Sequence, residues 1–286
     1  MHKLSIVIPV YDEAEEISNC INSLAKQTYK DFEIIIVDDG CTDDTIVLAK
    51  NTAENNNLNL KVLKQDHGGP GLGRNLGSKE AQGDILIFID ADMTFTDNYI
   101  ENLTKPILKH DDVLGTTHDY EIAVNTDNIY SALWGKIRVS KEDAPNVKIF
   151  RAIRKDKFLE LGGFDPKYSY ADDQTLWFKY ELTPTVAKDT TCYHKNPETL
   201  RGTYKQARWI GASWKERFFI FQKPIMSHLV SLLCFLFLPF MIIGKVFLDM
   251  KKGKMDIINR TKFYSYKFTG YLVGIFRALF LQRFAK

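Results

Sequence analysis

Short apolar runs alternate with stretches of helical spacing over the first third of the chain. Four such runs predict strands, of which the first is expected to be buried. They are Leu4–Val10, Phe32–Val37, Leu60–Leu63 and Ile85–Ile89. Apolar spacing and capping residues predict three helices between them, over Ala14–Gln27, Thr45–Asn55 and Arg74–Ala81. This alternation is typical of a parallel sheet with crossover helices, in which ligands bind beyond the carboxyl ends of the strands.

The pattern is less regular in the middle of the chain, where polar turns separate short apolar segments. We expect strands over Asp112–Glu121, Lys148–Ile153 and Thr185–Ala187. We expect helices over Asn128–Val139, over a short segment ending at Leu161, and over Asp172–Tyr180, with a turn at Gly162–Pro166. These elements continue the α/β pattern of the first third.

The last third is dominated by one long apolar stretch, Ile225–Leu248, with a shorter one at Phe268–Phe280. The first is long enough to cross a bilayer, for which about 20 residues suffice. Basic residues flank it on both sides, so a returning hairpin, a re-entrant segment and helices lying in the interface all remain open. A buried helix of a soluble protein is the alternative. We predict a catalytic domain over residues 1–222 and membrane-associated helices over 223–286.

Composition and charge indicate where in the cell the protein is expected to act. The chain has 286 residues and a net charge of +2, with acidic residues concentrated early and basic residues late. The basic end suits an anionic surface, either membrane or nucleic acid; we expect membrane and no nucleic acid. The four cysteines are widely spaced and form no CxxC pair, which favours reduced thiols. The N-terminus enters a strand without a signal-peptide pattern, so we expect the catalytic domain on the cytoplasmic face.

A pair of carboxylates follows the last of the four apolar runs. Asp90 and Asp92 flank Ala91 directly after Ile85–Ile89. Mg²⁺ or Mn²⁺ accepts one or two protein carboxylates and completes its shell with phosphate oxygens. A solvated turn is the alternative, but other strands also end in acidic loops, and these ends share one edge of the sheet. The motif therefore predicts a metal site.

Two further loops could bind a nucleotide. Asp39 lies in an Asp-Asp-Gly turn, where a carboxylate can accept a hydrogen bond from a base and Gly40 allows close approach; an ordinary turn is the alternative. The glycine-rich stretch His67–Gly73 could cradle phosphates, with Gly69 and Arg74 as contacts. It follows the third strand, whereas a dinucleotide fingerprint follows the first, which argues against an NAD or FAD enzyme.

Candidate acid–base and metal ligands occur later in the chain. Asp172 and Asp173 open a predicted helix, where one carboxylate could take a proton from an attacking hydroxyl, or both could interact with the helix dipole. His194 could be a metal ligand or a phosphate contact, or have a structural role.

Together these segments resemble family 2 glycosyltransferases of the GT-A fold, over roughly residues 3 to 210. The resemblance rests on the order and spacing of Ser5–Glu13, Val37–Asp43, Gly73–Asn75, Phe88–Asp92, Gly162–Asp165 and Asp172–Leu176. It implies a Rossmann-like domain with a mixed sheet flanked by helices. It also implies inverting transfer from a UDP-, GDP- or similar nucleotide-activated sugar, with Mn²⁺ or Mg²⁺ as cofactor.

The resemblance also implies roles for individual residues. It places Pro9, Tyr11 and Glu13 at the nucleotide and Asp39 at the base. It places Asp90, Ala91 and Asp92 at the ribose, diphosphate and metal, with Asp172 at the donor and Asp173 as catalytic base. On residue chemistry, His194 is a further candidate metal ligand.

Two departures from the family pattern matter. The usual Glu-Asp pair is Asp172-Asp173 here, which keeps the base. The Q-x-x-R-W motif of processive synthases is one residue short at Gln206-Ala207-Arg208-Trp209, which argues against processivity, although Arg208 and Trp209 remain candidates for binding diphosphate or acceptor.

The acceptor is predicted from the segment before the long apolar stretch. Basic and aromatic residues there suit a lipid headgroup surface, so we expect a lipid-linked or glycan acceptor. Two other functions stay open: a catalytically silent nucleotide-sugar-binding subunit of a membrane complex, and a nucleotidyltransferase. The pairing of Asp90 and Asp92 with Asp173 argues against the first. The absence of a glycine-rich loop after the first strand argues against the second.

Overall fold

The chain is described by a computed structural model that covers residues 3–217, 224–251 and 256–280. It divides into two compact units. The first comprises residues 1–123, 137–166 and 172–195, and the second comprises residues 124–136, 167–171 and 196–286. Each unit is described by itself.

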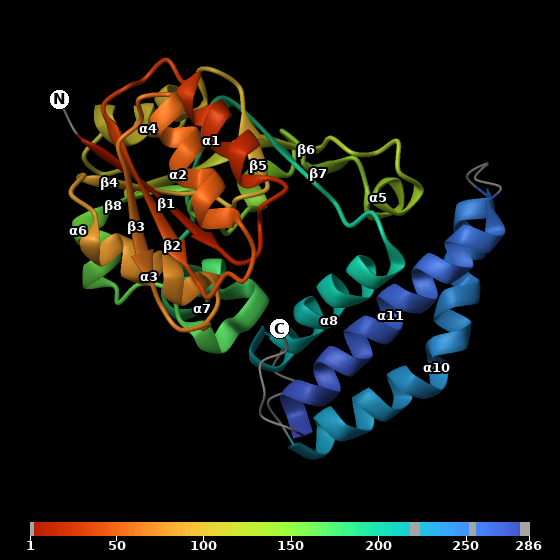
Figure 1. Cartoon of the computed structure of the whole chain (residues 1–286). Helices are drawn as coiled ribbons and strands as arrows, with labels where there is room; N and C mark the ends of the chain where they lie inside the picture. Colours follow the sequence, from red (N-terminus) through yellow and green to blue (C-terminus); the bar gives the residue numbers. More distant parts are fainter. Residues whose placement is uncertain (1–2, 218–223, 252–255, 281–286) are drawn as a thin grey trace. The chain divides into compact units, whose positions relative to one another are not determined.

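Four parallel strands form one half of the sheet in the first unit (Figure 1). They are β1 (Leu4–Val10), β2 (Phe32–Asp38), β3 (Leu60–Lys64) and β4 (Ile85–Phe88), in the order β3-β2-β1-β4. These strands match the four predicted from the apolar runs to within one residue at each end. β1, β2 and β4 are buried along almost their whole length, which is why their runs are largely apolar rather than alternating, whereas β3 at the sheet edge is partly exposed and contains Lys61 and Lys64.

The other half makes the sheet mixed. Its strands are β5 (Met93–Phe95), β6 (Gly115–Ala123), β7 (Ile137–Val139), β8 (Ala152–Arg154) and β9 (Thr185–His194). The order continues from β4 through β8, β6 and β9 to β5, with β7 paired to β6. β8 runs antiparallel to β4, and β9 runs parallel to β6 but antiparallel to β5. This confirms the α/β class and the mixed sheet.

Helices cover both faces of the sheet, in two separate apolar clusters (Figure 1). On one face lie α1 (Ile17–Ala25), α2 (Thr45–Asn55) and α4 (Tyr99–Lys109); on the other lie α3 (Pro70–Glu80), α6 (Lys155–Glu160) and α7 (Thr175–Tyr180). The alternation of a strand decides the face: Ile6 and Ile8 of β1 join the first cluster, and Val7 joins the second.

Several predicted boundaries were wrong for identifiable reasons. The helix predicted from Arg74 begins at Pro70, because the glycines that suggested a loop lie inside α3 and let it approach the sheet. A Cβ on Gly73 would lie 3.0 Å from that of Pro9. The helix predicted over Asn128–Val139 is α5 (Ile129–Trp134), which ends because Gly135 has φ +116°. β9 extends far beyond Ala187, and β5 and α4 were not predicted.

Three long helices make up most of the second unit and run side by side in Figure 1. They are α8 (Leu200–Arg217), α10 (Pro224–Lys251) and α11 (Ile257–Phe280). Glycines bring α8 and α11 into backbone contact: a Cβ on Gly270 would lie 2.7 Å from the carbonyl oxygen of Tyr204, and one on Gly274 would overlap that of Arg208. The predicted domain boundary after residue 222 falls between α8 and α10, whereas α8 packs with α11 in one unit. The division into a catalytic domain and membrane-associated helices stays a prediction.

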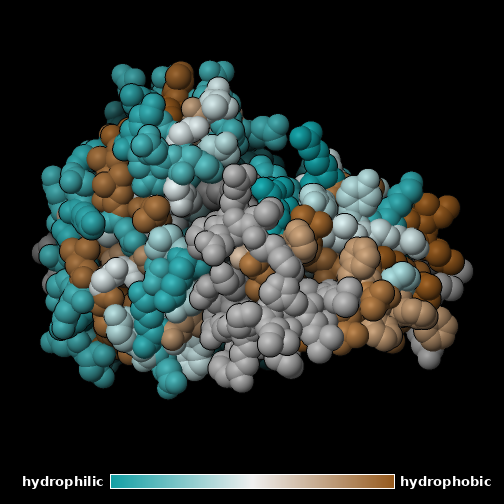
Figure 2. Space-filling view, turned by 90° about the horizontal axis from the view of Figure 1, so that it is seen from below, coloured by the Kyte–Doolittle hydropathy of each residue, from teal (hydrophilic) through white to brown (hydrophobic). Residues whose placement is uncertain are grey.

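A belt of exposed apolar side chains lies on α10. Figure 2 shows hydrophobic residues gathered on the surface of the second unit. The belt comprises Leu233, Phe235, Leu236, Phe237, Phe240, Met241, Ile243, Phe247 and Leu248. Among the residues whose side chains are described, no helix is both long and apolar enough to cross a bilayer. Residues 225–229, 231 and 232 of the predicted apolar stretch lie outside that set.

Candidate active site

The acidic turn between β4 and β5 lies at the carboxyl end of the parallel strands, as predicted. Asp90 and Asp92 are about one-third exposed, at 31% and 29% of their side chains, and Ala91 between them is buried. The backbone amide of Met93 donates to the carbonyl of Asp90 and closes the turn. The two carboxylates differ sharply in their partners.

Two buried guanidinium groups hold Asp90. Arg74 donates to one carboxylate oxygen at 2.5 Å, and Arg151 donates to the other at 3.2 Å. Burial alone would raise the pKa of Asp90, but these two charges hold it well below its usual range. Arg151 was not predicted as a site residue, although a cation inside the apolar segment Lys148–Ile153 needs a buried partner and was a usable signal.

Arg74 also reaches the predicted catalytic pair. Its second terminal nitrogen donates to Asp172 at 3.1 Å, so one side chain links Asp90 to Asp172 across the sequence. Burial, together with the neighbouring charge of Asp173, raises the pKa of Asp172. Asp172 also accepts from the backbone amide of Gly71, near the start of α3. Asp173 is half-buried, with one carboxylate oxygen out of contact with solvent.

His194 lies beside Asp92 because β5 pairs with the end of β9. Met93 is the register partner of His194, and this places the imidazole Nε2 3.4 Å from a carboxylate oxygen of Asp92. Burial raises the pKa of Asp92, and the negative charge of Asp90 raises it further. The Asp92 carboxylate is the kind of oxygen ligand that Mn²⁺ and Mg²⁺ prefer, whereas an imidazole is a less usual partner for these ions, so His194 as a metal ligand stays a prediction. Asp90, whose oxygens both accept from arginine, is less available, and its role as a ligand stays a prediction.

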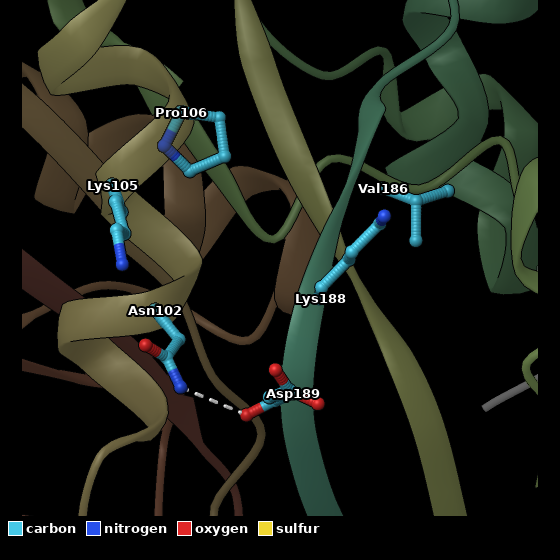
Figure 3. A pocket seen from close by; sticks show the side chains of 6 residues that line it. All are labelled: Asn102, Lys105, Pro106, Val186, Lys188 and Asp189. Carbon is cyan, nitrogen blue, oxygen red and sulfur yellow. Dashed lines mark hydrogen bonds between the residues drawn. The ribbon is translucent and has the colours of Figure 1, made fainter.

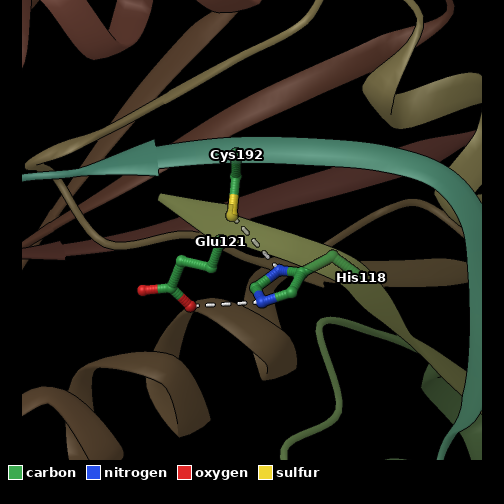
Figure 4. A group of neighbouring side chains, drawn as sticks. All are labelled: His118, Glu121 and Cys192. Atoms are coloured by element: carbon green, nitrogen blue, oxygen red, sulfur yellow. Dashed lines mark hydrogen bonds and ion pairs between the residues drawn. The ribbon is translucent and has the colours of Figure 1, made fainter. Parts of the chain in front are cut away.

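A buried polar chain continues from His194 into the sheet. Arg138 contacts Nδ1 of His194 and pairs with Glu121 at 3.2 Å, and Glu121 pairs with Nε2 of His118 at 3.2 Å. His118, Glu121 and Cys192 cluster closely (Figure 4), and three such groups can hold a metal. Here the thiol lies 3.4 Å from Nδ1 of His118, and burial raises its pKa well above the usual value. Burial thus keeps the thiol and the imidazole neutral, whereas His118 and Arg138 lower the pKa of Glu121, which is ionised and paired with both.

The predicted base-binding carboxylate is enclosed by the loop before α3. Asp39 accepts from the Gln65 side chain and the Gly68 amide, both at 2.7 Å, and from the Gly69 amide at 3.0 Å. Its side chain is 2% exposed. Gly69 has φ +99°, which lets the loop turn into the helix. In this arrangement the Gly69 amide bonds Asp39, although it was predicted to face phosphate.

The remaining predicted nucleotide residues lie at the end of β1. Pro9 is part of that strand, and Tyr11 follows it, 37% exposed, with its ring stacked on His67 at a centroid separation of 4.2 Å. The backbone amide of Glu13 donates to Thr45 at the start of α2. Tyr11 therefore presents an aromatic face close to Asp39.

Arg208 and Trp209 belong to the second unit, on α8. Trp209 packs edge-to-face against Tyr170, with ring centroids 5.0 Å apart. Their part in binding diphosphate or acceptor stays a prediction.

A surface pocket lies apart from the predicted site residues. It encloses about 420 Å³ between α4 and β9 and is lined by Asn102, Lys105, Pro106, Val186, Lys188 and Asp189 (Figure 3). Asn102 donates to the carbonyl oxygen of Asp189 at 3.0 Å across it. Its rim consists of flexible surface lysines, and we assign it no role.

Comparison with known proteins agrees with this geometry. The family model described as glycosyl transferase family 2 matches residues 5–162. Poly(ribitol-phosphate) β-N-acetylglucosaminyltransferase TarS of Staphylococcus aureus (strain Mu50 / ATCC 700699) is 37% identical over 94 residues, which are 32% of this chain and 16% of that protein. The match thus spans about a sixth of that curated relative.

Two solved structures share the fold. The first is S. aureus TarS 1-349 in complex with UDP-GlcNAc, at a TM-score of 0.54 and 20% identity, covering 96% of this chain and 91% of that one. The second is the mannosyltransferase PcManGT from Pyrobaculum calidifontis in complex with GDP-Man and Mn²⁺, at 0.61 and 16%, covering 99% and 88%. At this identity the likeness shows the fold.

Proposed function

The chain belongs to glycosyl transferase family 2 and is a glycosyltransferase, and from this premise we propose that it is an inverting enzyme. Its donor is a nucleotide-diphospho-sugar, its cofactor Mn²⁺ or Mg²⁺, and its acceptor a hydroxyl or phosphate of a lipid-linked or glycan molecule. The UDP-GlcNAc and GDP-Man complexes of the structural relatives support a donor of this class.

One observation carries the proposal: the Arg74 guanidinium joins the acidic turn to the carboxylate pair on the other side of the site. Asp90 and Asp172 lie far apart in the sequence, yet a single buried cation bonds both. Arg74 thereby fixes the spacing between the edge that would hold metal and diphosphate and the edge that carries Asp173. Such preorganisation supports reaction between two separately bound substrates.

In the proposed reaction Asp173 accepts a proton from the acceptor, whose oxygen attacks the anomeric carbon from the face opposite the nucleotide. The bond from the anomeric carbon to the diphosphate oxygen breaks, and the configuration inverts. Asp92 and His194 would hold the metal ion. When bound, that ion supplies positive charge to the departing diphosphate. Arg74 and Arg151 keep Asp90 ionised and fixed in position.

The belt of exposed apolar residues on α10 supports the proposal that the second unit associates with a membrane. We also propose that the catalytic unit lies on the cytoplasmic face of that membrane. Exposed apolar patches of this size are typical of membrane or protein contacts. Basic side chains of α8, Arg201 and Lys205 among them, would suit anionic headgroups. Lipid binding would bring a lipid-linked acceptor to the enzyme.

A donor panel tests the proposal. Purified enzyme is incubated with UDP- and GDP-sugars, with and without polyprenyl-phosphate, in Mn²⁺, Mg²⁺ or EDTA. We expect sugar transfer from one donor class, loss of transfer in EDTA, and a rise in the Mn²⁺ concentration needed for half-maximal rate in His194→Ala. Nucleotide-sugar binding without any product would contradict catalysis, and release of sugar 1-phosphate would indicate nucleotidyl transfer instead.

A further inference from the structure

His67 lies between Tyr11 and Asp39, the two groups that the family resemblance places at the nucleotide and its base. Its ring stacks on Tyr11, with centroids 4.2 Å apart and planes inclined by 38°. Its Nδ1 lies 3.1 Å from a carboxylate oxygen of Asp39 and 3.0 Å from the Asp39 carbonyl oxygen. The His67 ring thus packs on Tyr11 and directs a ring nitrogen to Asp39. These are the two contacts that we expect of a nucleobase at this site.

The carboxylate of Asp39 has little capacity left for a further donor. Besides His67, it accepts from Gln65, Gly68 and Gly69 at distances between 2.7 and 3.0 Å. A carboxylate offers about four lone-pair positions, and these three hydrogen-bond donors, with His67 Nδ1 also close to it, leave little room for a further donor. A base N–H can bond Asp39 once one of them leaves.

His67 is the donor that can leave with least disturbance. The Gly68 and Gly69 amides belong to the backbone that starts α3, whereas the imidazole is a side chain with 38% exposure. Tyr11 is equally open at 37% exposure. The ring can therefore turn into solvent without opening the apolar core, and its departure uncovers both the face of Tyr11 and one acceptor of Asp39.

We propose that His67 occupies the nucleobase position in the ligand-free enzyme and is displaced by the base, so that it sets the affinity for the donor nucleotide. The inference rests on the nucleotide site of the proposed function. Protein in which His67 occupies the site does not bind the base. The measured affinity is therefore the intrinsic affinity multiplied by the fraction of protein in which His67 has left the site. The direction of the change in affinity distinguishes this proposal: removing His67 strengthens nucleotide binding, whereas removing a residue that contacts the nucleotide weakens it.

The test measures UDP and GDP binding by isothermal titration calorimetry to wild type, His67→Ala and Tyr11→Ala. We expect His67→Ala to bind about three- to tenfold more tightly, from the loss of one stacked pair and one hydrogen bond. Tyr11→Ala should bind more weakly. His110→Ala, an exposed histidine after α4, is the matched control and should bind as wild type does. Proton NMR provides a second readout: UDP should abolish contacts between the His67 and Tyr11 rings.

Two results would overturn the inference, and they differ from failure of the function itself. Weaker or unchanged binding in His67→Ala, with binding retained in wild type, would mean that His67 is not a competitor. Persistence of the ring contacts at saturating UDP would mean the same. If neither wild type nor His67→Ala binds any nucleotide, the nucleotide site of the proposed function fails together with the inference.

Discussion

The two compact units handle charge and apolar surface in opposite ways. In the first unit, charged side chains are matched and mostly buried: the partly exposed Asp90 lies between two buried arginines, and the buried Glu121 lies between Arg138 and His118. In the second, the apolar belt of α10 is exposed, with Phe240 at 69%. Burying charges costs free energy unless they are paired, so the first pattern marks a positioned polar site. Exposing large apolar side chains to water is also costly, so the exposed belt of α10 indicates a surface that contacts another apolar partner.

The largest effect should come from the first unit. Asp173→Asn removes the proposed proton acceptor but keeps the shape of the side chain. We expect kcat to fall about 10³-fold, because general-base catalysis contributes on this order, with donor affinity unchanged. Steady-state transfer rates and calorimetric binding of the donor nucleotide measure the two quantities. Turnover close to wild type would remove Asp173 from its assigned role.

The contrast between units is tested most directly by membrane binding. A double Phe235→Asp, Phe240→Asp variant should partition into anionic lipid vesicles at least about 100-fold less than wild type, because each exposed phenyl ring contributes roughly 1.5–3 kcal/mol when buried. Vesicle flotation measures this. Val47→Asp places the same charge at an exposed apolar position of α2 in the first unit and should leave partitioning unchanged. Equal losses in both variants would mean that the apolar belt is not the lipid contact.

A smaller effect should separate packed from exposed glycines within the second unit. Gly274→Ala puts a methyl group against the α8 backbone at Arg208 and should lower the free energy of unfolding by about 2 kcal/mol. Gly244, in α10, has open space around its Cβ position, so Gly244→Ala should stabilise by up to about 1 kcal/mol through helix propensity. Chemical denaturation compares them. Equal shifts would contradict close packing of α8 on α11.

The smallest effect concerns a buried carboxylate of the second unit. Burial would raise the pKa of Asp249, but hydrogen bonds from Tyr264 and Arg260, both at 2.6 Å, bring it below the usual value. Its stabilising contribution is therefore present above the unfolded pKa of about 3.9 and is lost as the pH falls through the folded value. Denaturation midpoints at successively lower pH should decline less in Asp249→Asn than in wild type. Parallel declines would show that other groups carry the acid sensitivity.

The sequence by itself determined the parallel half of the sheet and the local motifs. The runs that became β1, β2 and β4 are buried along almost their whole length, and the edge strand β3 keeps three apolar residues, so each strand is apparent from its own residues. The acidic turn at Asp90 and Asp92 directly follows such a strand, and its position at the sheet edge follows from parallel pairing. Motif order was enough for the family, which the match over residues 5–162 confirms.

The tertiary structure decided which of these groups meet. β5 has three residues, too few for a periodic pattern, yet its pairing with β9 places His194 beside Asp92. Arg151 and Arg74 become partners of Asp90 through strand order and helix packing, which no local spacing encodes. His67 appeared as part of a glycine-rich loop, and only the fold brings its ring onto Tyr11 and its nitrogen to Asp39. Local patterns reflect the burial of each segment, whereas contacts between distant segments depend on the whole chain.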